Sequence, residues 1–467
     1  MKSLSGWLRG SIVIGVLGYL GLSGYIYYYD KQRIQTVTPS ISSSYENIKL
    51  LETLESTGCD YCHMPSTPLP FYSKLPIAKQ LMEYDVNLGY KSFDFPPIRN
   101  SLINGTQPPE SDLSKLEWVI EHNTMPPARY TSLHWSGFFK PEEKERVLRW
   151  IKGERQKYYA LEKTSEKTQH EPIQPIPLSL PAQKDKATLG SLLYHDPRLS
   201  KDNSISCASC HQLDMGGTDN KKTSIGVNGQ IGPINAPTVF NSVFNVKQFW
   251  DGRANNLQEQ AGGPPLNPIE MASSSWQEII EKLNKDLELK KQFTTVYPEG
   301  FTEMTITDAI AEFEKTLITV NSPFDQYLRG NDNVLTAQQL RGYSLFKENK
   351  CATCHVGKTL GGQSFEPLGL KKDFAFSNIT NADLGVFNIT KNERDRFRQK
   401  VPTLRNISET APYFHRGDIK TLDEAVKLML EYQVGKTLPQ KDIDDIIAFL
   451  NSLTGSYISI ENQKNLQ

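Results

Sequence analysis

Apolar residues recur at helical spacing in several stretches of the chain, and no stretch alternates convincingly between apolar and polar residues as a β-strand does. Residues three and four positions apart share one face of a helix, so this spacing predicts buried helical stripes. Helices are predicted over Pro141–Tyr158, Thr336–Glu348 and Asp442–Leu453, and a fourth is predicted to bury Ile306 and Leu317. The predicted fold class is therefore mostly α, with long loops between the helices.

The longest apolar run lies near the N-terminus, where Ser11 to Tyr29 contains no charged residue. A membrane-spanning helix needs about 20 apolar residues, and tyrosines are typical of a helix end that meets lipid headgroups. A cleaved signal peptide is the alternative, but no clear small-x-small cleavage site precedes Asp30. Basic residues flank both ends of the run, so charge alone does not fix its orientation. Residues 1–30 are predicted to form an uncleaved transmembrane anchor.

Composition and charge narrow the function only slightly. The formal net charge is −1, which provides no general attraction to nucleic acid, and no nucleic-acid partner is expected. A chain of 467 residues has room for about three domains of roughly 150 residues each. Residues 161–182 are first charged and then rich in proline, without a helical period, and they are interpreted as a linker.

All six cysteines of the chain fall in three Cys-x-x-Cys-His motifs. The motifs are Cys59/Cys62/His63, Cys207/Cys210/His211 and Cys351/Cys354/His355. Two thiols at this spacing can each form a thioether to a haem vinyl group, and the histidine that follows becomes the proximal iron ligand. A zinc site would need ligand sets paired at short range, and a redox dithiol needs no histidine after the second cysteine. Three covalently bound haem c groups are therefore predicted.

The even spacing of the motifs indicates three cytochrome c-like haem domains in tandem behind one N-terminal transmembrane helix. The predicted domains are an N-terminal haem domain over 45–158, a second over 183–332 and a third over 333–455. With this anchor, the protein is expected in the bacterial inner membrane as a single-pass protein. Because bacteria attach c-type haem outside the cytoplasmic membrane, its catalytic body is expected in the periplasm.

The sixth ligand of each iron bears on function, because an iron with two strong protein ligands transfers electrons, whereas a vacant distal face can bind a small oxidant. For the first haem, Met125 is expected, because it lies in a Pro-rich loop before the last helix of its domain. For the third haem, Met429 is expected, because no other methionine follows Met304. The alternative ligands are His122 or His134 for the first haem and His415 for the third.

The second haem differs, because no histidine lies between His211 and His355. The methionines of that interval are Met215, Met271 and Met304. Met215 is too close in the chain to His211 to reach the opposite face of a haem. Met271 directly follows Glu270. The simplest interpretation is a vacant distal face with the Glu270 carboxyl beside it, which is how a haem activates peroxide.

The segment from Leu189 to Met429 resembles the bacterial dihaem cytochrome c peroxidases. The matching stretches are Asp-Pro-Arg-Leu-Ser (196–200), Ser-Cys-Ala-Ser-Cys-His (206–211), Asn-Ala-Pro-Thr-Val-Phe-Asn (235–241), Gln-Phe-Trp-Asp-Gly-Arg-Ala (248–254), Pro-Phe-Asp-Gln-Tyr-Leu-Arg-Gly (323–330) and Thr-Ala-Pro-Tyr-Phe-His (410–415). A further haem domain behind an anchor resembles the trihaem, inner-membrane branch linked to quinol oxidation. The resemblance implies reduction of hydrogen peroxide to water, with a membrane quinol or a cytochrome c as electron donor.

The resemblance also implies roles for individual residues. The haem on His211 is then the peroxidatic centre, and the haem on His355 and Met429 supplies it with electrons. Around the peroxidatic haem the matches are Glu270 to the distal glutamate, Gln260 to the distal glutamine and Trp250 to the indole between the two haems. A calcium ion is implied at Asn235, Thr410 and Pro412, through a side-chain amide and backbone carbonyls.

One position departs from the family pattern, and two other functions compete. Many members carry a histidine after Thr-Ser-x-Gly that caps the oxidised peroxidatic iron, where this chain has Val227. Activation by reductive loss of that ligand is therefore not expected. The first competing function is a non-catalytic multihaem electron-transfer cytochrome of a respiratory chain, with six-coordinate iron throughout. The second is a dihaem enzyme that oxidises protein side chains, in which a tyrosine ligand stands where this chain has Met429.

Overall fold

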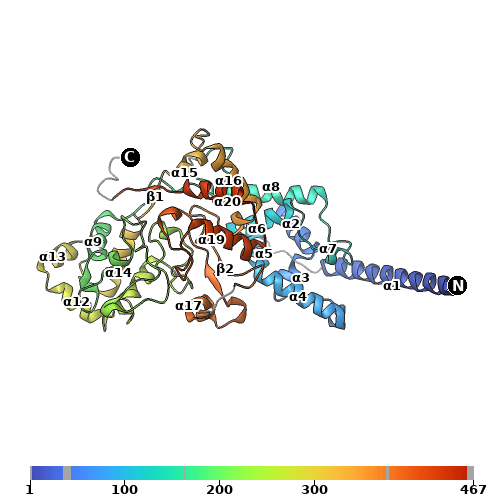
Figure 1. The fold of residues 1–467 in the computed structure, drawn as a ribbon, viewed down its shortest axis with the longest axis horizontal. Helices are drawn as coiled ribbons and strands as arrows, with labels where there is room; N and C mark the ends of the chain where they lie inside the picture. The colour runs from blue at the N-terminus through green and yellow to red at the C-terminus, as the bar shows by residue number, and fades with distance from the viewer. Residues whose placement is uncertain (1–2, 35–43, 162–163, 375–377, 460–467) are drawn as a thin grey trace. The chain divides into compact units, whose positions relative to one another are not determined.

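The computed structural model describes residues 3–34, 44–161, 164–374 and 378–459 (Figure 1). The chain forms two compact units, which divide after Tyr158. Helices predominate in both, so the mostly α fold class is confirmed. The strands of the described residues form two short antiparallel pairs, and these are β1 (Thr319–Val320) with β4 (Ser456–Tyr457), and β2 (Phe365–Pro367) with β3 (Arg398–Lys400).

The N-terminal unit is entirely helical in its described residues. Its helices are α1 (Ser3–Ile34), α2 (Tyr45–Ser56), α3 (Cys59–His63), α4 (Pro76–Ser92), α5 (Phe95–Asn104), α6 (Glu110–Glu121), α7 (Ala128–Thr131) and α8 (Pro141–Tyr158). Helix α8 has the predicted bounds. Within α1, the segment Gly10–Gln32 is long and apolar enough to cross a membrane by length and composition. Most of that segment is exposed, and only its second half contributes buried side chains to the unit.

The C-terminal unit holds the second and third Cys-x-x-Cys-His motifs. Its helices are α9 (Lys184–Tyr194), α10 (Cys207–Cys210), α11 (Leu257–Gly262), α12 (Trp276–Asn284), α13 (Leu287–Val296), α14 (Glu303–Glu314), α15 (Pro323–Leu328), α16 (Ala337–Glu348), α17 (Asn381–Leu384), α18 (Phe387–Thr390), α19 (Leu422–Met429) and α20 (Gln440–Asn451). The predicted helices correspond to α14, α16 and α20. Helix α16 begins one residue later than predicted, α20 begins and ends two residues earlier, and Leu317 lies just beyond the end of α14. Thr336 caps α16 instead of lying inside it, because its side chain accepts a hydrogen bond from the backbone of Gln339.

The C-terminal unit contains two helix crossings of the same design. In the crossing of α9 with α14, a Cβ atom on Gly190 would lie 1.9 Å from the carbonyl oxygen of Ala309. In the crossing of α16 with α20, a Cβ atom on Gly342 would lie 1.9 Å from the carbonyl oxygen of Asp445. The absence of a side chain on each glycine allows the two backbones to touch.

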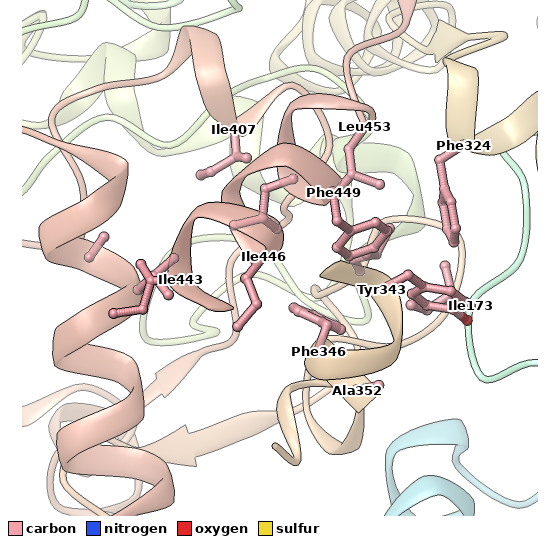
Figure 2. Close-up of a cluster of buried hydrophobic side chains, with 14 of the residues drawn as sticks. Ile173, Phe324, Tyr343, Phe346, Ala352, Ile407, Ile443, Ile446, Phe449 and Leu453 are labelled. Atoms are coloured by element: carbon pink, nitrogen blue, oxygen red, sulfur yellow. The ribbon is translucent and has the colours of Figure 1, made fainter. Parts of the chain in front are cut away.

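Aromatic side chains surround the second of these crossings (Figure 2). The Phe449 ring of α20 lies 5.0 Å from the rings of both Phe324 and Tyr343, measured between centroids. Phe346 of α16 packs against the same ring from 5.3 Å. This cluster fixes the helix that leads directly into the third haem motif.

The segment interpreted as a linker, residues 161–182, is packed in its proline-rich half, so that interpretation was wrong there. Ile173 and Ile176 are fully buried. The backbone of Pro172 accepts a hydrogen bond from Gly357 over 2.9 Å, and the side chain of Asp325 accepts one from Ile176 over 3.1 Å. The prolines hold this stretch extended, so Ile173 enters the core of the third haem region, whereas Ile176 packs with Ile318 and Val320.

Replacing Gly342 with alanine is expected to lower the free energy of unfolding by about 1–3 kcal/mol, because the new Cβ atom must push α16 away from α20. Thermal unfolding followed by circular dichroism measures the change. Gly153→Ala in α8 is the control, since no atom lies within 4 Å of its Cβ position. The control is expected to be neutral or stabilising by up to about 1 kcal/mol. Equal losses in both variants would contradict the tight crossing.

Candidate active site

The Cys-x-x-Cys-His motifs lie on short helical turns. The first motif forms α3, both cysteines of the second lie in α10 with His211 directly after it, and the third begins with a 3-10 turn over Cys351–Thr353. A helical turn brings residues three apart to one side, so both thiols of the first two motifs face the same way. Burial raises the pKa of the thiols, to about 11 in Cys59 and about 12 in Cys62, Cys207 and Cys351. The thiols therefore stay protonated, unlike the activated thiolate of a redox dithiol.

The second cysteine of the third motif departs from this arrangement. The 3-10 turn ends at Thr353, so Cys354 caps the turn, whereas Cys62 and Cys210 lie inside their helices. The backbone N–H of Cys354 still donates to the Cys351 carbonyl oxygen over 3.3 Å, which keeps the two residues close. Its half-buried Sγ atom lies 3.7 Å from the Thr353 hydroxyl oxygen. Cys354 therefore does not lie within one helical turn with Cys351, as the cysteines of the other two motifs do. The thioether from Cys354 to a haem stays a prediction.

The three motif histidines suit a haem iron. The Nδ1 atom of His63 lies 3.0 Å from the carbonyl oxygen of Phe93, and Nδ1 of His355 lies 2.9 Å from that of Leu360. A ring that donates from Nδ1 keeps the lone pair of Nε2 free for a metal. Burial lowers the pKa of all three imidazoles, which keeps them neutral. The donor set present in the chain thus fits haem c.

His211 is held differently from the other two histidines. Its Nδ1 atom is buried and has no hydrogen-bond partner among the described residues. Burial lowers the pKa of this imidazole, and the backbone groups of Gly217 and Pro237 oppose the shift. The hydroxyl of Tyr194 donates to the carbonyl oxygen of His211 over 2.6 Å and so holds the backbone of the motif.

Glu270 lies close to the second motif. Its charge is near enough to raise the pKa of both Cys207 and Cys210. Its Oε1 atom accepts a hydrogen bond from the Asn267 side-chain amide over 2.9 Å. Burial raises the pKa of the Glu270 carboxyl, although the charge of Arg253 and the Asn267 bond oppose the shift. A buried carboxyl with a raised pKa beside a cofactor motif is a candidate proton carrier.

The loop with the departure from the family pattern packs directly against Glu270. The backbone N–H of Val227 donates to the Glu270 carbonyl oxygen over 2.8 Å. A Cβ atom on Gly226 would lie 2.0 Å from the carbonyl oxygen of Ile269, so the loops interlock. Val227 itself is buried. The backbone of Val227, which stands where many family members are expected to carry a histidine, is therefore bonded directly to the backbone of Glu270.

The other residues predicted around the second haem are more scattered. Gln260 lies half-buried in α11, and the hydrogen bonds of the described residues do not join its side chain to Glu270. Met271 belongs to the buried apolar cluster formed with α12 and α13. Met304 is 66% exposed at the start of α14. Nothing in these positions adds a second polar group beside Glu270.

Trp250 lies where segments of the second and third predicted domains meet. Its indole N–H donates to the Asn235 carbonyl oxygen over 2.9 Å, and its ring meets the His415 ring edge-on at 6.1 Å between centroids. The backbone N–H of Asn235 in turn donates to the His415 carbonyl oxygen over 2.8 Å. The indole is thus in contact with the chain on both sides of this boundary.

A buried lysine next to Trp250 is a feature that the sequence pattern did not reveal. The backbone N–H of Lys400 donates to the Trp250 carbonyl oxygen over 2.7 Å. Its ammonium group donates to the carbonyl oxygen of Lys247 over 3.2 Å. Burial lowers the pKa of Lys400 to about 8, although the charge of Asp251 opposes the shift. Among the described residues no carboxylate is bonded to this buried ammonium group, which therefore suits an anionic group of the cofactor, such as a haem propionate.

Glu314 is a second feature that only the structure shows. It lies at the end of α14 among apolar residues, and its charge is near enough to raise the pKa of Cys207. Its Oε2 atom is buried and has no hydrogen-bond partner among the described residues. Burial raises the pKa of this carboxyl to about 8. The side of the second motif thus carries a carboxyl that is neutral at pH 7.

The predicted sixth ligands of the other haems lie in exposed or half-buried positions. Met125 follows α6 in an exposed loop, and Met429 is the last residue of α19. His134 and His415 already use ring nitrogens in bonds with carboxylates, each over 2.7 Å. The third alternative, His122, stacks on Trp118 at 4.0 Å between centroids and is exposed. The methionine ligands remain predictions.

The predicted calcium ligands come from neighbouring loops. The side-chain amide of Asn235 donates to the carbonyl oxygens of Lys221 and Lys222, over 2.9 and 3.3 Å. Thr410 and Pro412 are half-buried. A Cβ atom on Gly216, in the loop after the second motif, would lie 3.1 Å from the Glu409 carbonyl oxygen. Among the described residues no cluster of histidine, cysteine and carboxylate side chains could hold a metal. A carbonyl site of the predicted kind contains none of these side chains and stays a prediction.

Comparison with known proteins agrees with these features. The model of the "Di-haem cytochrome c peroxidase" family matches residues 184–333, a "Haem-binding domain" matches 18–153 and "Cytochrome c" matches 339–454. The chain is 62% identical to the cytochrome c peroxidase Ccp of Escherichia coli strain K12, over 95% of this chain and 96% of that protein. It is 49% identical to the cytochrome c551 peroxidase of Nitrosomonas europaea, over 61% of this chain and 85% of that protein.

Solved structures show the same fold. The crystal structure of a MauG-like protein associated with microbial copper homeostasis superposes with a TM-score of 0.53 at 28% identity, over 61% of this chain and 93% of the other.

The titration of Glu314 is expected to make the stability of the folded protein depend on pH. A carboxyl with a pKa raised to about 8 is protonated in the folded state, whereas the unfolded chain ionises it near pH 4.5. Its contribution to stability is therefore complete below pH 4.5 and is lost as the pH rises towards 8. Glu314→Gln should remove this loss, so its melting temperature should exceed that of the wild type increasingly between these pH values. Glu281→Gln, an exposed position of α12, is the control and should follow the wild type.

Proposed function

Because the chain belongs to the di-haem cytochrome c peroxidase family, we propose that it reduces hydrogen peroxide to water at the haem attached through Cys207 and Cys210. The observation that carries this proposal is the half-buried Glu270 carboxyl next to that motif, with its raised pKa. The absence of histidine between His211 and His355 supports it, because the distal face then has no imidazole available from that stretch.

Glu270 is proposed as the group that moves the proton. The haem supplies the electrons and the iron to which peroxide binds. Glu270 accepts a proton from the peroxide oxygen nearer the iron and delivers it to the other oxygen, which then leaves as water instead of hydroxide. The overall reaction takes up two electrons and two protons and yields two waters. Asn267 keeps the carboxyl in place, because its amide is bonded to Oε1.

Two further residues complete the proposed site. The Gln260 amide is free to orient peroxide and to stabilise charge as the O–O bond breaks. Val227 is buried and its apolar side chain cannot ligate iron, so the proposed ligand position needs no reductive opening. Trp250 is proposed to lie on the electron path into the site, because it contacts Asn235 on one side and His415 on the other.

The electrons are proposed to come from a membrane quinol, with a cytochrome c as the alternative donor. His63 and Met125 would hold the haem of the first motif, which would receive these electrons. Cys351 and Cys354 would attach the haem of the third motif, and His355 and Met429 would ligate it, so that it would supply the peroxide site with electrons.

The same proposal places the protein at a membrane. Helix α1 supports an inner-membrane anchor by its length and composition. The catalytic body is then periplasmic. A calcium ion bound by Asn235, Thr410 and Pro412 would join the loops that hold Trp250 and His415 in place.

Glu270→Gln is expected to lower the turnover of peroxide by about 10²–10⁴-fold, because the amide cannot carry the proton. All haem should remain attached, as measured by the absorbance of the pyridine haemochrome. Glu299→Gln, an exposed loop carboxylate of the same unit, should keep full activity. Peroxide consumption that is unchanged in Glu270→Gln would remove this residue from the mechanism.

The fully oxidised protein is expected to contain a high-spin ferric haem and to turn over peroxide without prior reduction, because Val227 cannot ligate iron. Electron paramagnetic resonance of the resting protein, together with turnover from the oxidised state, tests this. A resting spectrum that is entirely low spin would favour the electron-transfer cytochrome instead.

A further inference from the structure

A chain of buried polar side chains crosses the N-terminal unit. The Tyr72 hydroxyl lies 2.6 Å from Nε2 of His134, and Nδ1 of His134 lies 2.7 Å from Oδ2 of Asp30. The residues are only 6%, 3% and 2% exposed, respectively. Burial of a carboxylate and an imidazole is unfavourable unless they are paired, and here each bonds the other. Both ring nitrogens of His134 are occupied, so this residue is not available to ligate an iron in this arrangement.

The polar chain adjoins the first haem motif. Tyr61, which lies between Cys59 and Cys62, donates its hydroxyl hydrogen bond to Oδ1 of Asp30 over 3.2 Å. The Tyr130 ring stacks on the His134 ring at 3.9 Å between centroids, with 8° between the planes. A Cβ atom on Gly58 would lie 1.9 Å from the Tyr130 hydroxyl oxygen. The motif and the polar chain are therefore packed against each other.

The same polar chain lies at the end of the apolar helix. Asp30 is near the C-terminal end of the apolar segment Gly10–Gln32 of α1. An aromatic rim consists of Tyr19 and Tyr25 on α1 and of Phe71 and Trp135, whose rings pack against them, and its members are 43–51% exposed. Within the rim, the Tyr25 and Phe71 rings lie 5.3 Å apart and the Tyr19 and Trp135 rings 6.3 Å apart. Exposed aromatic side chains of this kind are typical of the headgroup level of a membrane.

These features match the chemistry of a lipid-borne quinol. A quinol is apolar, and its oxidation releases two protons with two electrons, so its site needs proton acceptors close to a redox centre. A soluble cytochrome c donates electrons without releasing protons, so its oxidation would not need a buried carboxylate–imidazole pair. The aromatic rim provides an apolar approach, the polar chain lies behind it, and the haem motif adjoins both.

We propose that Tyr72, His134 and Asp30 form the proton-accepting part of a quinol-oxidation site beneath the aromatic rim. This inference rests on the quinol donor of the proposed function. The two O–H bonds of the quinol break as it becomes quinone. The protons pass to His134, shared with Asp30, and then to solvent. The electrons pass singly to the haem of the first motif and finally reduce peroxide, which takes up two protons to form two waters.

The test uses the full-length protein in detergent micelles with two electron donors. One donor is a short-chain ubiquinol, and the other is an ascorbate-reduced phenylenediamine dye that reduces the haems directly. The variants Tyr72→Phe, His134→Gln and Asp30→Asn are expected to lower quinol-dependent peroxide reduction at least 10-fold and to leave the dye-dependent rate unchanged. Tyr158→Phe is the matched control, since it removes a hydroxyl bonded to the Gly105 carbonyl oxygen over 3.1 Å in the same unit.

Two readouts do not depend on turnover. The absorption spectrum of the first haem should be the same in every variant. Its anaerobic reduction by ubiquinol, followed by stopped flow without peroxide, should slow at least 10-fold in Tyr72→Phe. That variant loses one oxygen atom only, so it keeps the test valid if His134→Gln does not fold.

The outcomes separate this inference from the proposed function. An unchanged ubiquinol rate in Tyr72→Phe and His134→Gln would overturn the inference, and so would equal losses with ubiquinol and dye, which indicate a purely structural brace. A wild-type protein that uses the dye but no ubiquinol would overturn the quinol donor, and this inference with it, but not peroxide reduction. A wild-type protein inactive with every donor would overturn the proposed function itself.

Discussion

The burial of a neutral imidazole at the end of each Cys-x-x-Cys-His motif is the constraint on which the rest of the structure depends. A histidine can present Nε2 to an iron only if its ring is held, and in His63 and His355 a backbone carbonyl holds it through Nδ1. Those carbonyls belong to residues further along the chain, so the chain after the first and third motifs must fold back over them. The glycine contacts at Gly190 and Gly342 bring the surrounding helices close enough to enclose the motifs.

Within this frame, the C-terminal unit accumulates ionisable groups that burial has shifted. Glu270 and Glu314 have raised pKa values, and Lys400 has a lowered one. Each shift reflects the energy of holding a charge away from water, because burial favours the neutral form of each group. Two carboxyls and a lysine with shifted pKa values therefore lie within the same unit. Such groupings are typical of active sites, because catalysis needs groups that change charge easily.

The N-terminal unit also buries ionisable side chains, but there they are paired with each other. Its buried carboxylate and imidazole are stabilised by each other and by two tyrosine hydroxyls, so both remain bonded without water. The pair sits beside a haem motif at the end of a helix apolar enough to cross a membrane. In the proposed enzyme, protons and electrons from the donor separate at this point. The protons stay near the membrane surface, and the electrons go on to the peroxide site.

The sequence by itself determined the elements whose signals are local. Spacing along the chain sets which side chains share a helix face, so neighbouring residues were enough to predict the helices α8, α14, α16 and α20. Short stretches of sequence likewise revealed the three haem motifs, the apolar N-terminal segment and the family resemblance. The family resemblance was needed to single out Glu270, since a carboxylate in a loop has no local signature of function. The packing of Ile173 and Ile176 was missed, because prolines and charges nearby indicated a linker.

Only the tertiary structure decided which charges are buried and what they touch. Asp30 and His134 are 104 positions apart in the chain, and Lys400 bonds the backbone of Lys247 across 153 positions. Glu314 falls within a predicted helix, yet its raised pKa comes entirely from the apolar groups around it. A side chain loses its contact with water because of the residues that folding packs around it. A pattern of adjacent residues therefore does not show which charged side chains are buried.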